Sequence, residues 1–186
     1  MVEVQVENII VSFTISSSLD LPKLAEILPD ATYDPDEVPA IVLHFSKPRS
    51  MATLFSTGDV VVTGPRSMDE VHDVVKMVTD RLDVVGVQLD ETPELKVMNV
   101  TASTDLRQSL KLRRLAKSLQ TVEYNRKVFP GLVYKGDDPN TVILLFDSGK
   151  IVCNGIRLED VTVALDKMLE KLLSFGIKKE ENVCQK

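Results

Sequence analysis

The sequence has little of several residue types, and each shortage excludes a class of protein. Tryptophan is absent, and aromatic residues make up 5% of the 186 residues. The two cysteines, Cys153 and Cys184, are too few for a disulfide framework, so we expect two free thiols in a reducing cytoplasm. No apolar run reaches the roughly 18 residues that a transmembrane helix needs. The chain starts with an acidic, alternating stretch, which does not resemble a signal peptide.

The chain also lacks the residue groupings that enzymes and metal sites use. His44 and His72 have no Cys or carboxylate at zinc-ligand spacing, and Cys153 has no base near it in the sequence. The glycines in 64–66 and 154–157 belong to turns and not to a phosphate-binding loop. We therefore expect no enzymatic activity, no metal and no cofactor.

Positive charge is scarce overall but unevenly distributed. The net charge of −6 argues against a uniformly basic nucleic-acid-binding protein. Residues 1–91 carry 6 Lys and Arg against 16 Asp and Glu, a net charge of −10, whereas residues 92–186 carry 16 against 12, a net charge of +4. Any polyanion should therefore prefer the second half of the chain.

An internal repeat organises the sequence. The stretch Phe129–Gly155 holds three short apolar runs separated by turn residues, which is typical of a three-stranded antiparallel meander. It recurs 91 residues earlier as Val38–Gly64. With this offset, Val6–Ser67 aligns to Val97–Leu158 without a gap, and 19 of the 62 pairs are identical. A long period seen only twice indicates a duplicated half-domain and not a solenoid.

Each repeat is predicted to contain a strand, a short helix, four strands and a long helix. In the first repeat these are Val2–Ile15, Leu21–Leu28 (capped by Asp20), Ala31–Tyr33, Ile41–Phe45, Ala52–Ser56, Val60–Thr63 and a helix from Ser67 or Asp69 to about Val84. In the second they are Leu95–Thr104, Leu110–Leu119, Val122–Tyr124, the three meander strands and Glu159–Ser174. The predicted class is α+β. We expect one domain, 1–186, with repeats over 4–88 and 95–178 and a polar tail over 179–186.

The predicted strands carry apolar side chains on both faces. One face receives Ile9, Val11, Leu54, Val60 and Val62, and the other receives Ile10, Thr53, Phe55, Val61 and Thr63, with the second repeat following at the aligned positions. Four helices are enough to cover one face of ten strands. The other face would be an exposed apolar patch, which marks a binding surface. The alternative is that a dimer or the tail buries it.

Several stretches resemble the TATA-box-binding protein family in its short archaeal-type form. The second repeat carries VMNVTAS at Val97–Ser103, EYNRKVFPGLVYK at Glu123–Lys135 and LLFDSGKIVCNG at Leu144–Gly155, and the first repeat has weaker counterparts. The resemblance covers residues 4–178. It implies a pseudo-two-fold saddle made of a ten-stranded antiparallel curved sheet with four helices on the convex face. It also implies that the concave face binds the minor groove of AT-rich double-stranded DNA.

The family is itself the standard example of apolar wedges in the minor groove. The resemblance implies that Phe55, Phe129 and Phe146 are DNA wedges that kink the duplex. Val38 occupies the fourth wedge position, where it fills space but cannot stack on a base, so that kink should be softer. Core packing is the alternative for any one of these phenylalanines.

The residues that read the minor groove should combine hydrogen-bond donors with apolar surface, because A·T pairs present mainly acceptors there. The resemblance implies that Asn8 and Asn99 form the family's central asparagine pair; satisfied strand-end amides are the alternative. Thr63 matches a family threonine, and its partner position holds Asn154. The other reader positions are Ile10, Thr101, Val61, Val152, Leu144 and Pro130.

The resemblance assigns the phosphate contacts to Lys135, Lys150, Arg157 and Arg66. Asp59 replaces a family lysine and should repel a phosphate. Each phosphate contact contributes roughly 0.9 to the salt slope of binding. We therefore expect DNA binding that is weaker than is usual for the family and more unequal between the two repeats. The complex should dissociate at lower salt.

The resemblance also implies a general transcription factor for initiation that docks a transcription factor B-like protein on the loop before the second FPGL. That loop is normally acidic but carries Arg126 and Lys127 here, while the first repeat keeps an acidic loop at Asp34–Glu37. The partner either has compensating charge or is a different one. We expect a monomer on DNA, with a dimer as the alternative when free. Its place would be the nucleoid if archaeal and the nucleus if eukaryotic. The alternative function is a divergent paralogue with weak DNA binding that acts as a protein-interaction regulator.

Overall fold

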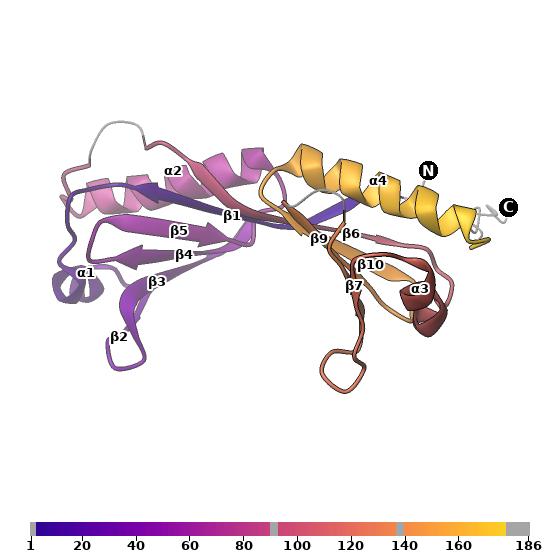
Figure 1. The fold of residues 1–186 in the computed structure, drawn as a ribbon. Coiled ribbons are helices and arrows are strands. Elements are labelled where there is room, and N and C mark those ends of the chain that lie inside the picture. Colours follow the sequence, from indigo (N-terminus) through magenta and orange to yellow (C-terminus); the bar gives the residue numbers. More distant parts are fainter. Residues whose placement is uncertain (1–2, 90–92, 137–139, 178–186) are drawn as a thin grey trace, which may run out of the picture. The chain divides into compact units, whose positions relative to one another are not determined.

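The computed structural model describes residues 3–89, 93–136 and 140–177 (Figure 1). Three predicted features lie outside the described residues: the thiol of Cys184, the polar tail over 179–186 and the centre of the turn at 137–139. The chain divides into two compact units, one of residues 7–99 and one of residues 1–6 with 100–186.

The first repeat follows the predicted order of elements. These are β1 (Gln5–Thr14), α1 (Leu21–Ile27), β2 (Ala31–Asp34), β3 (Val38–Ser46), β4 (Arg49–Phe55), β5 (Asp59–Thr63) and α2 (Met68–Val84). Its strands are ordered β2-β3-β4-β5-β1 across the sheet, and neighbours run antiparallel.

The second repeat has the same order. It contains β6 (Lys96–Asp105), α3 (Leu112–Ser118), β7 (Val122–Glu123), β8 (Leu132–Tyr134), β9 (Thr141–Leu145), β10 (Lys150–Gly155) and α4 (Leu158–Ser174). Its strands are ordered β6-β10-β9-β8-β7, again antiparallel. The described residues thus confirm an α+β fold with ten antiparallel strands and four helices in two tandem repeats.

Helix starts follow capping chemistry in the first repeat and a main-chain contact in the second. Asp20 caps α1 by accepting a hydrogen bond from Lys23 N–H, and Ser67 caps α2 by accepting one from Glu70 N–H. The prediction that α3 starts at Leu110 was wrong. Leu110 N–H donates to the carbonyl of Asp147 (2.9 Å), and Lys111 has no side chain that can cap, so the helix begins at Leu112.

The core lies between each long helix and one face of its sheet. Helix α2 packs on β4 and β5, and α4 packs on β9 and β10. The sheet residues beneath them are almost fully buried, and they are Leu54, Val60 and Val62 in the first repeat and Leu145, Ile151 and Cys153 in the second. Burying each such side chain stabilises the fold by roughly 1.5–3 kcal/mol.

The tight turns after β4 and after β9 each require a glycine, because the backbone there has a positive φ. Gly58 has φ +85° and Gly149 has φ +98°, and each donates its N–H to the carbonyl of a phenylalanine, Phe55 or Phe146 (both 3.0 Å). A Cβ on Gly58 would lie 1.7 Å from the Ser16 carbonyl oxygen, and one on Gly149 would lie 2.2 Å from that of Gln108. The same turn therefore fixes the end of β4 and of β9 in both repeats.

None of the described helices is both long enough and apolar enough to cross a membrane. Within the described ranges, the side chains of His, Cys, Asp and Glu form no group of three or more that could hold a metal ion.

Candidate nucleic-acid interface

The face of each sheet opposite its long helix is partly exposed. Burial alternates along β4, β5, β9 and β10, with each buried residue followed by a partly exposed one. The partly exposed set is largely apolar, and in the first repeat it contains Ile10, Thr53, Phe55, Val61 and Thr63. In the second it contains Thr101, Leu144, Phe146, Val152 and Asn154. We call these surfaces the open faces. No helix of the described residues buries either face, since these side chains stay partly exposed.

The two wedge candidates of the second repeat form a pair. Phe129 lies in the loop before β8 and Phe146 directly after β9, and their ring centroids are 5.9 Å apart at 64°, an edge-to-face arrangement. Both rings are partly exposed. Gly131 makes room for them, because a Cβ there would lie 2.7 Å from Phe129 Cε1 and 3.2 Å from Phe146 Cε1. Such pairs contribute about 0.5–1.5 kcal/mol beyond area burial, so each ring holds the other in place.

The corresponding position of the first repeat is built with smaller side chains. Phe55 ends β4 and is partly exposed, while Val38 starts β3 and is 47% exposed. Buried Ala40 pairs with Phe55 across the strands and occupies the place of Gly131. A ring at Val38 would therefore meet the Ala40 methyl group. The first repeat has one ring here and the second has two.

Asn8 is held by one side of its amide. Its Oδ1 accepts hydrogen bonds from Gly64 N–H (2.7 Å) and from Thr63 Oγ1 (3.2 Å). Because a backbone N–H can only donate, the oxygen must face it and the Nδ2 group must face the other way. Among the described residues Nδ2 has no hydrogen-bond partner. The Asn8 amide, which lies inside β1, therefore has a bonded oxygen and keeps its two N–H donors.

The second repeat holds an amide in a similar way with other residues. Thr101 and Asn154 are Cα partners between β6 and β10, and Thr101 Oγ1 donates to Asn154 Oδ1 (2.7 Å). Asn99 is also partly exposed and takes part in a further polar interaction. Of the other reader candidates, Ile10, Val61, Val152 and Leu144 are partly exposed on the open faces and Pro130 is exposed before β8.

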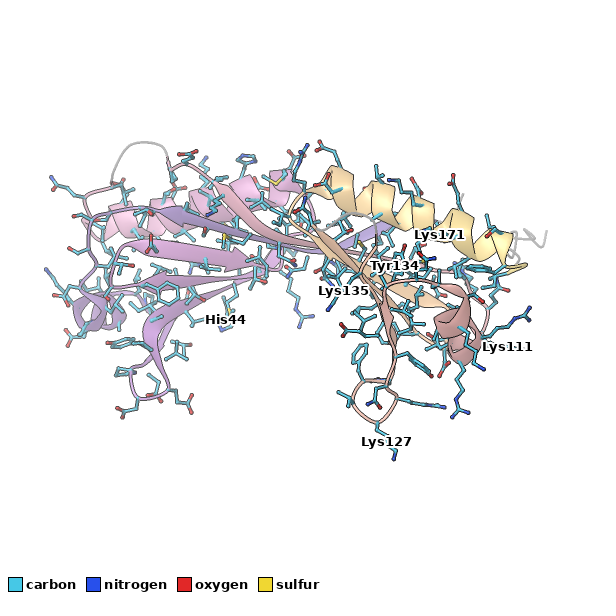
Figure 2. The ribbon with its side chains drawn as sticks, in the orientation of Figure 1. His44, Lys111, Lys127, Tyr134, Lys135 and Lys171 are labelled. Carbon is cyan, nitrogen blue, oxygen red and sulfur yellow. The ribbon has the colours of Figure 1, made fainter. Side chains whose placement is uncertain are left out.

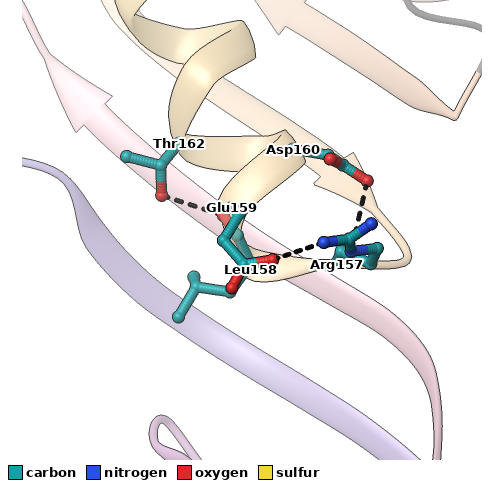
Figure 3. A network of polar contacts seen from close by, with 5 residues as sticks. All are labelled: Arg157, Leu158, Glu159, Asp160 and Thr162. Atoms are coloured by element: carbon teal, nitrogen blue, oxygen red, sulfur yellow. Dashed lines mark hydrogen bonds and ion pairs between the residues drawn. The ribbon is translucent and has the colours of Figure 1, made fainter.

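Two of the three basic residues of the second repeat that were assigned to phosphates are paired with carboxylates. Lys135 Nζ lies 2.6 Å from Glu123 Oε1. Arg157 lies 2.8 Å from Glu159 and 3.9 Å from Asp160 at the start of α4 (Figure 3). The hydrogen bond that Arg157 donates to Glu159, together with the charges of Asp160 and Glu159, raises the pKa of the Arg157 guanidinium. All these groups are at the surface, where solvent screens such pairs and they contribute little, so a phosphate could replace the carboxylates.

The remaining phosphate candidates, Lys150 and Arg66, are exposed. Lys150 begins β10, and Arg66 donates its backbone N–H to Glu70 (2.6 Å) just before α2. His44 occupies in the first repeat the position of Lys135 in the second (Figure 2).

Asp59 is a fixed negative charge beside the first open face. Its carboxylate accepts hydrogen bonds from Thr14 Oγ1 (2.7 Å) and Thr57 Oγ1 (2.8 Å). These bonds, that from Thr14 first, lower the pKa of Asp59 below its usual range. A depression lined by Phe55, Val61 and Asp59 also includes Lys96. Lys96 was not identified from the sequence as a candidate site residue, because Lys96 precedes the stretch Val97–Ser103 that resembles the family.

The loops before β3 and β8 share a backbone turn but not a charge. Asp34 and Asn125 each accept a hydrogen bond through Oδ1 from the N–H two residues on, at 3.1 Å to Asp36 and 3.2 Å to Lys127. The first loop is Asp-Pro-Asp-Glu and the second is Asn-Arg-Lys-Val. Lys127 lies at the tip of the second loop (Figure 2).

Comparison with known proteins adds independent findings. A family model described as "Transcription factor TFIID (or TATA-binding protein, TBP)" matches residues 3–84 and 94–175. The TATA-box-binding protein of Thermococcus sibiricus is 39% identical over 181 residues, covering 97% of this chain and 98% of that protein. That of Haloarcula marismortui is 40% identical over 177 residues, covering 94% and 95%. The structure of Methanococcus jannaschii TBP matches with a TM-score of 0.81 at 36% identity, covering 92% of this chain and 99% of that one.

Proposed function

Because this chain belongs to the TATA-binding protein family, we propose that it is a general transcription factor that binds and bends AT-rich, TATA-like promoter DNA through its open faces. The observation that carries the proposal is the pair of partly exposed apolar sheet faces, which bear amide donors and, at strand ends, one phenylalanine ring in the first repeat and two in the second. The relatives named above are called TATA-box-binding proteins, and none of them is described as a protein-only regulator. We further propose that the two repeats act as one DNA-binding domain.

The wedge step falls mainly to the second repeat. Phe129 and Phe146 are partly exposed and already arranged as a pair, so inserting them between base steps requires no rearrangement of the backbone. Stacking of a base on an aromatic ring is worth about 1–3 kcal/mol, which offsets the cost of unstacking a base step. Phe55 supplies one such contact in the first repeat, and Val38 supplies only apolar contact.

The sequence preference comes from amide donors and apolar side chains on the open faces. At A·T pairs the minor groove presents acceptors, adenine N3 and thymine O2, whereas a G·C pair adds the guanine amino group as a donor. Asn8 and Asn154 can each give Nδ2–H to an acceptor because their Oδ1 atoms are already bonded. Val61 and Val152 would lie against the groove floor. A guanine amino group would meet donors and methyl groups, so G·C sites are disfavoured.

Phosphate binding is proposed for Lys135, Lys150 and Arg157 in the second repeat and for Arg66 in the first. Lys135 and Arg157 would exchange their surface carboxylate partners for phosphates. Asp59 repels a phosphate at the position where the second repeat has Lys150. The electrostatic contribution is therefore larger on the second repeat.

Members of this family work with the transcription machinery, and we propose a transcription factor B-like partner for this chain. A basic docking surface would be attracted by the loop Asp34–Glu37 and repelled by Arg126 and Lys127. The charges therefore favour docking at the first repeat. The protein would bind DNA as a monomer.

The direct test is DNA affinity measured against salt for a TATA-like duplex and for a G·C duplex of equal length. We expect a complex on the TATA-like duplex at low salt, a much weaker one on the G·C duplex, and a bend detected by energy transfer between labelled DNA ends. Equal affinity for the two duplexes, or no complex at low salt without competitor DNA, would overturn the proposal.

A further inference from the structure

Six basic residues lie along one side of the second repeat, and none of them is among the phosphate contacts proposed above. We call them the basic rim, and they are Lys111, Arg113, Arg114, Lys117, Arg126 and Lys127. All six are exposed. Around α3, residues 113, 114 and 117 project opposite to the buried Leu112 and Leu115. The aligned residues of the first repeat, in the same order, are Asp20, Pro22, Lys23, Glu26, Pro35 and Asp36.

The charges of the basic rim are largely uncompensated. Among the described residues, five of the six have no ion-pair partner. The exception is Arg126, which lies 3.7 Å from Asp147 with both side chains at least half exposed. This differs from Lys135 and Arg157, whose cations are each held by a carboxylate within 3 Å. Among the described residues, most of the second repeat's cations that have no ion-pair partner are therefore on the rim, the others being Lys96 and Lys167.

Asp147 joins the two parts of the rim to the wedge pair. Its carbonyl accepts the N–H of Leu110, next to Lys111, and its carboxylate pairs with Arg126. It directly follows Phe146 in the chain, and Lys127 is two residues before Phe129. Two residues of extended chain span at most about 7 Å. The rim thus begins beside the two rings that are proposed to enter the base stack.

We propose that the basic rim binds the phosphates of duplex DNA immediately beyond the step wedged by Phe129 and Phe146, an inference that rests on the proposed function. A duplex carries one phosphate charge per ~1.7 Å of its axis, and the charges interact within about 8–10 Å at physiological salt. A duplex that accepts Phe129 and continues beyond that step must therefore bring several phosphates within range of Lys127 and Arg126. An acidic protein would have to compete with them. Asp147 is an acidic group that pairs with Arg126 at this place, and it reduces the effect.

The binding site is consequently extended on one side only. The first repeat has acidic residues or proline at most of the aligned positions and gives the flanking duplex no such support. Flanking DNA should be held at the end of the site that lies on the second repeat and released at the other end.

The test compares two duplexes and two variants of the full chain. One duplex ends with the TATA-like site and has no flanking base pairs, and the other adds one helical turn on each side. The rim variant is Lys111→Gln/Arg126→Gln/Lys127→Gln. The control variant, Lys23→Gln/Lys76→Gln/Lys167→Gln, removes three exposed charges elsewhere. Circular dichroism and the unfolding midpoint establish that both are folded.

On the long duplex the rim variant should lose about tenfold or more in affinity, and its salt slope should fall by roughly 3, since three contacts are lost and each removes about 0.9. On the short duplex it should bind nearly as the natural chain does, and the control variant should bind like the natural chain on both. Asp147→Asn should raise affinity on the long duplex alone.

Equal behaviour of the rim variant on the two duplexes would overturn the proposal. So would unchanged DNA binding together with lost binding to poly-glutamate, which would assign the rim to an acidic protein. If the natural chain binds neither duplex at low salt, the proposed function itself fails, and that result is distinct from a failure of the rim alone.

Discussion

The two repeats have the same elements in the same order but carry different charges and different rings. Buried positions changed little between them: Leu54 aligns with Leu145 and Val60 with Ile151, and all four are fully buried. At positions outside the core, the side chains differ in the sign of their charge or in their size. Asp59 aligns with Lys150, Asp36 with Lys127 and Val38 with Phe129. Core packing restricts side-chain volume, because even one added or removed methylene group changes the stability of the fold. A surface position tolerates a change of charge. The duplicated fold was kept while the binding surfaces of the repeats diverged.

The largest expected effect tests what the repeats share, the glycine turn. Gly149→Ala should lower the free energy of unfolding by roughly 2–5 kcal/mol, because a left-handed backbone disfavours a Cβ and the methyl group would collide with the Gln108 carbonyl. Gly58→Ala should cost at least as much. Gly176→Ala, with φ +79° and nothing within 4 Å, should cost only about 1 kcal/mol. Urea unfolding measures all three, and equal losses at positions 149 and 176 would contradict the steric argument.

The second prediction tests the difference in rings. Phe146→Ala should abolish the DNA bend and weaken binding by about 2–4 kcal/mol, since it removes a stacked ring and the edge-to-face partner of Phe129. Phe55→Ala should cost about 1–3 kcal/mol, because it removes one ring without a partner. Energy transfer across a labelled duplex measures the bend and a titration measures the affinity. Equal losses for the two variants would show that the repeats contribute alike.

The third prediction concerns the amide donors. Asn8→Asp and Asn154→Asp keep the oxygens that accept from Gly64 N–H and Thr101 Oγ1, so the fold should persist. Each replaces donors by a charged acceptor facing the groove, and each should weaken binding to A·T sites by roughly 1–3 kcal/mol. Unchanged discrimination between the TATA-like and G·C duplexes in both variants would mean that these amides do not read the groove.

A fourth change should make the first repeat more like the second. Val38→Phe/Ala40→Gly supplies the missing ring together with the space that Gly131 provides in the second repeat. We expect affinity to rise by about 1 kcal/mol, the lower limit for one stacked base. Val38→Phe alone should gain less, because the Ala40 methyl group displaces the ring, and Ala40→Gly alone is the matched control. A single variant that equals the double would contradict this packing.

The smallest effect concerns Asp59. Because hydrogen bonds from Thr14 and Thr57 lower its folded pKa, it stays charged below its ordinary value of 3.8, and mild acidification to about pH 5 cannot relieve its repulsion of phosphate. The stability linked to this shift is present above the unfolded pKa and lost as the pH falls through the folded pKa. Asp59→Asn should raise DNA affinity slightly and equally at pH 5 and pH 7. A gain seen only at pH 7 would contradict the lowered pKa.

Most of the fold could be predicted because each step depended on residues near one another in the chain. The offset of 91 residues gave the two repeats, and period-2 alternation separated Val60 and Val62 from Val61, as their burial confirms. Ser67 was a recognisable cap. Several strand ends were set too short, since Val38–Pro39 and Arg49–Ser50 join strands through their cross-strand partners and not through their own propensity.

Contacts between distant residues could not be predicted from the sequence. Nothing in the sequence shows that Asn8 is held by Gly64, that Lys135 pairs with Glu123 or that Arg126 pairs with Asp147. These depend on register and on loop backbone. The roles of the site residues in DNA binding remain predictions, to be decided by the variants above.

The turn that follows Phe146 determines which molecule deforms on contact. Phe146 N–H donates to the carbonyl of Lys150, and the Phe146 carbonyl accepts from Gly149 N–H. These two hydrogen bonds close the turn between β9 and β10, and they fix the backbone of Phe146. A residue held in this way is rigid, whereas a pyrimidine–purine step such as TA is among the most easily deformed base steps in DNA. In the proposed complex the mechanical work is therefore done on the duplex, and promoter choice becomes partly a selection for the most pliable sequence.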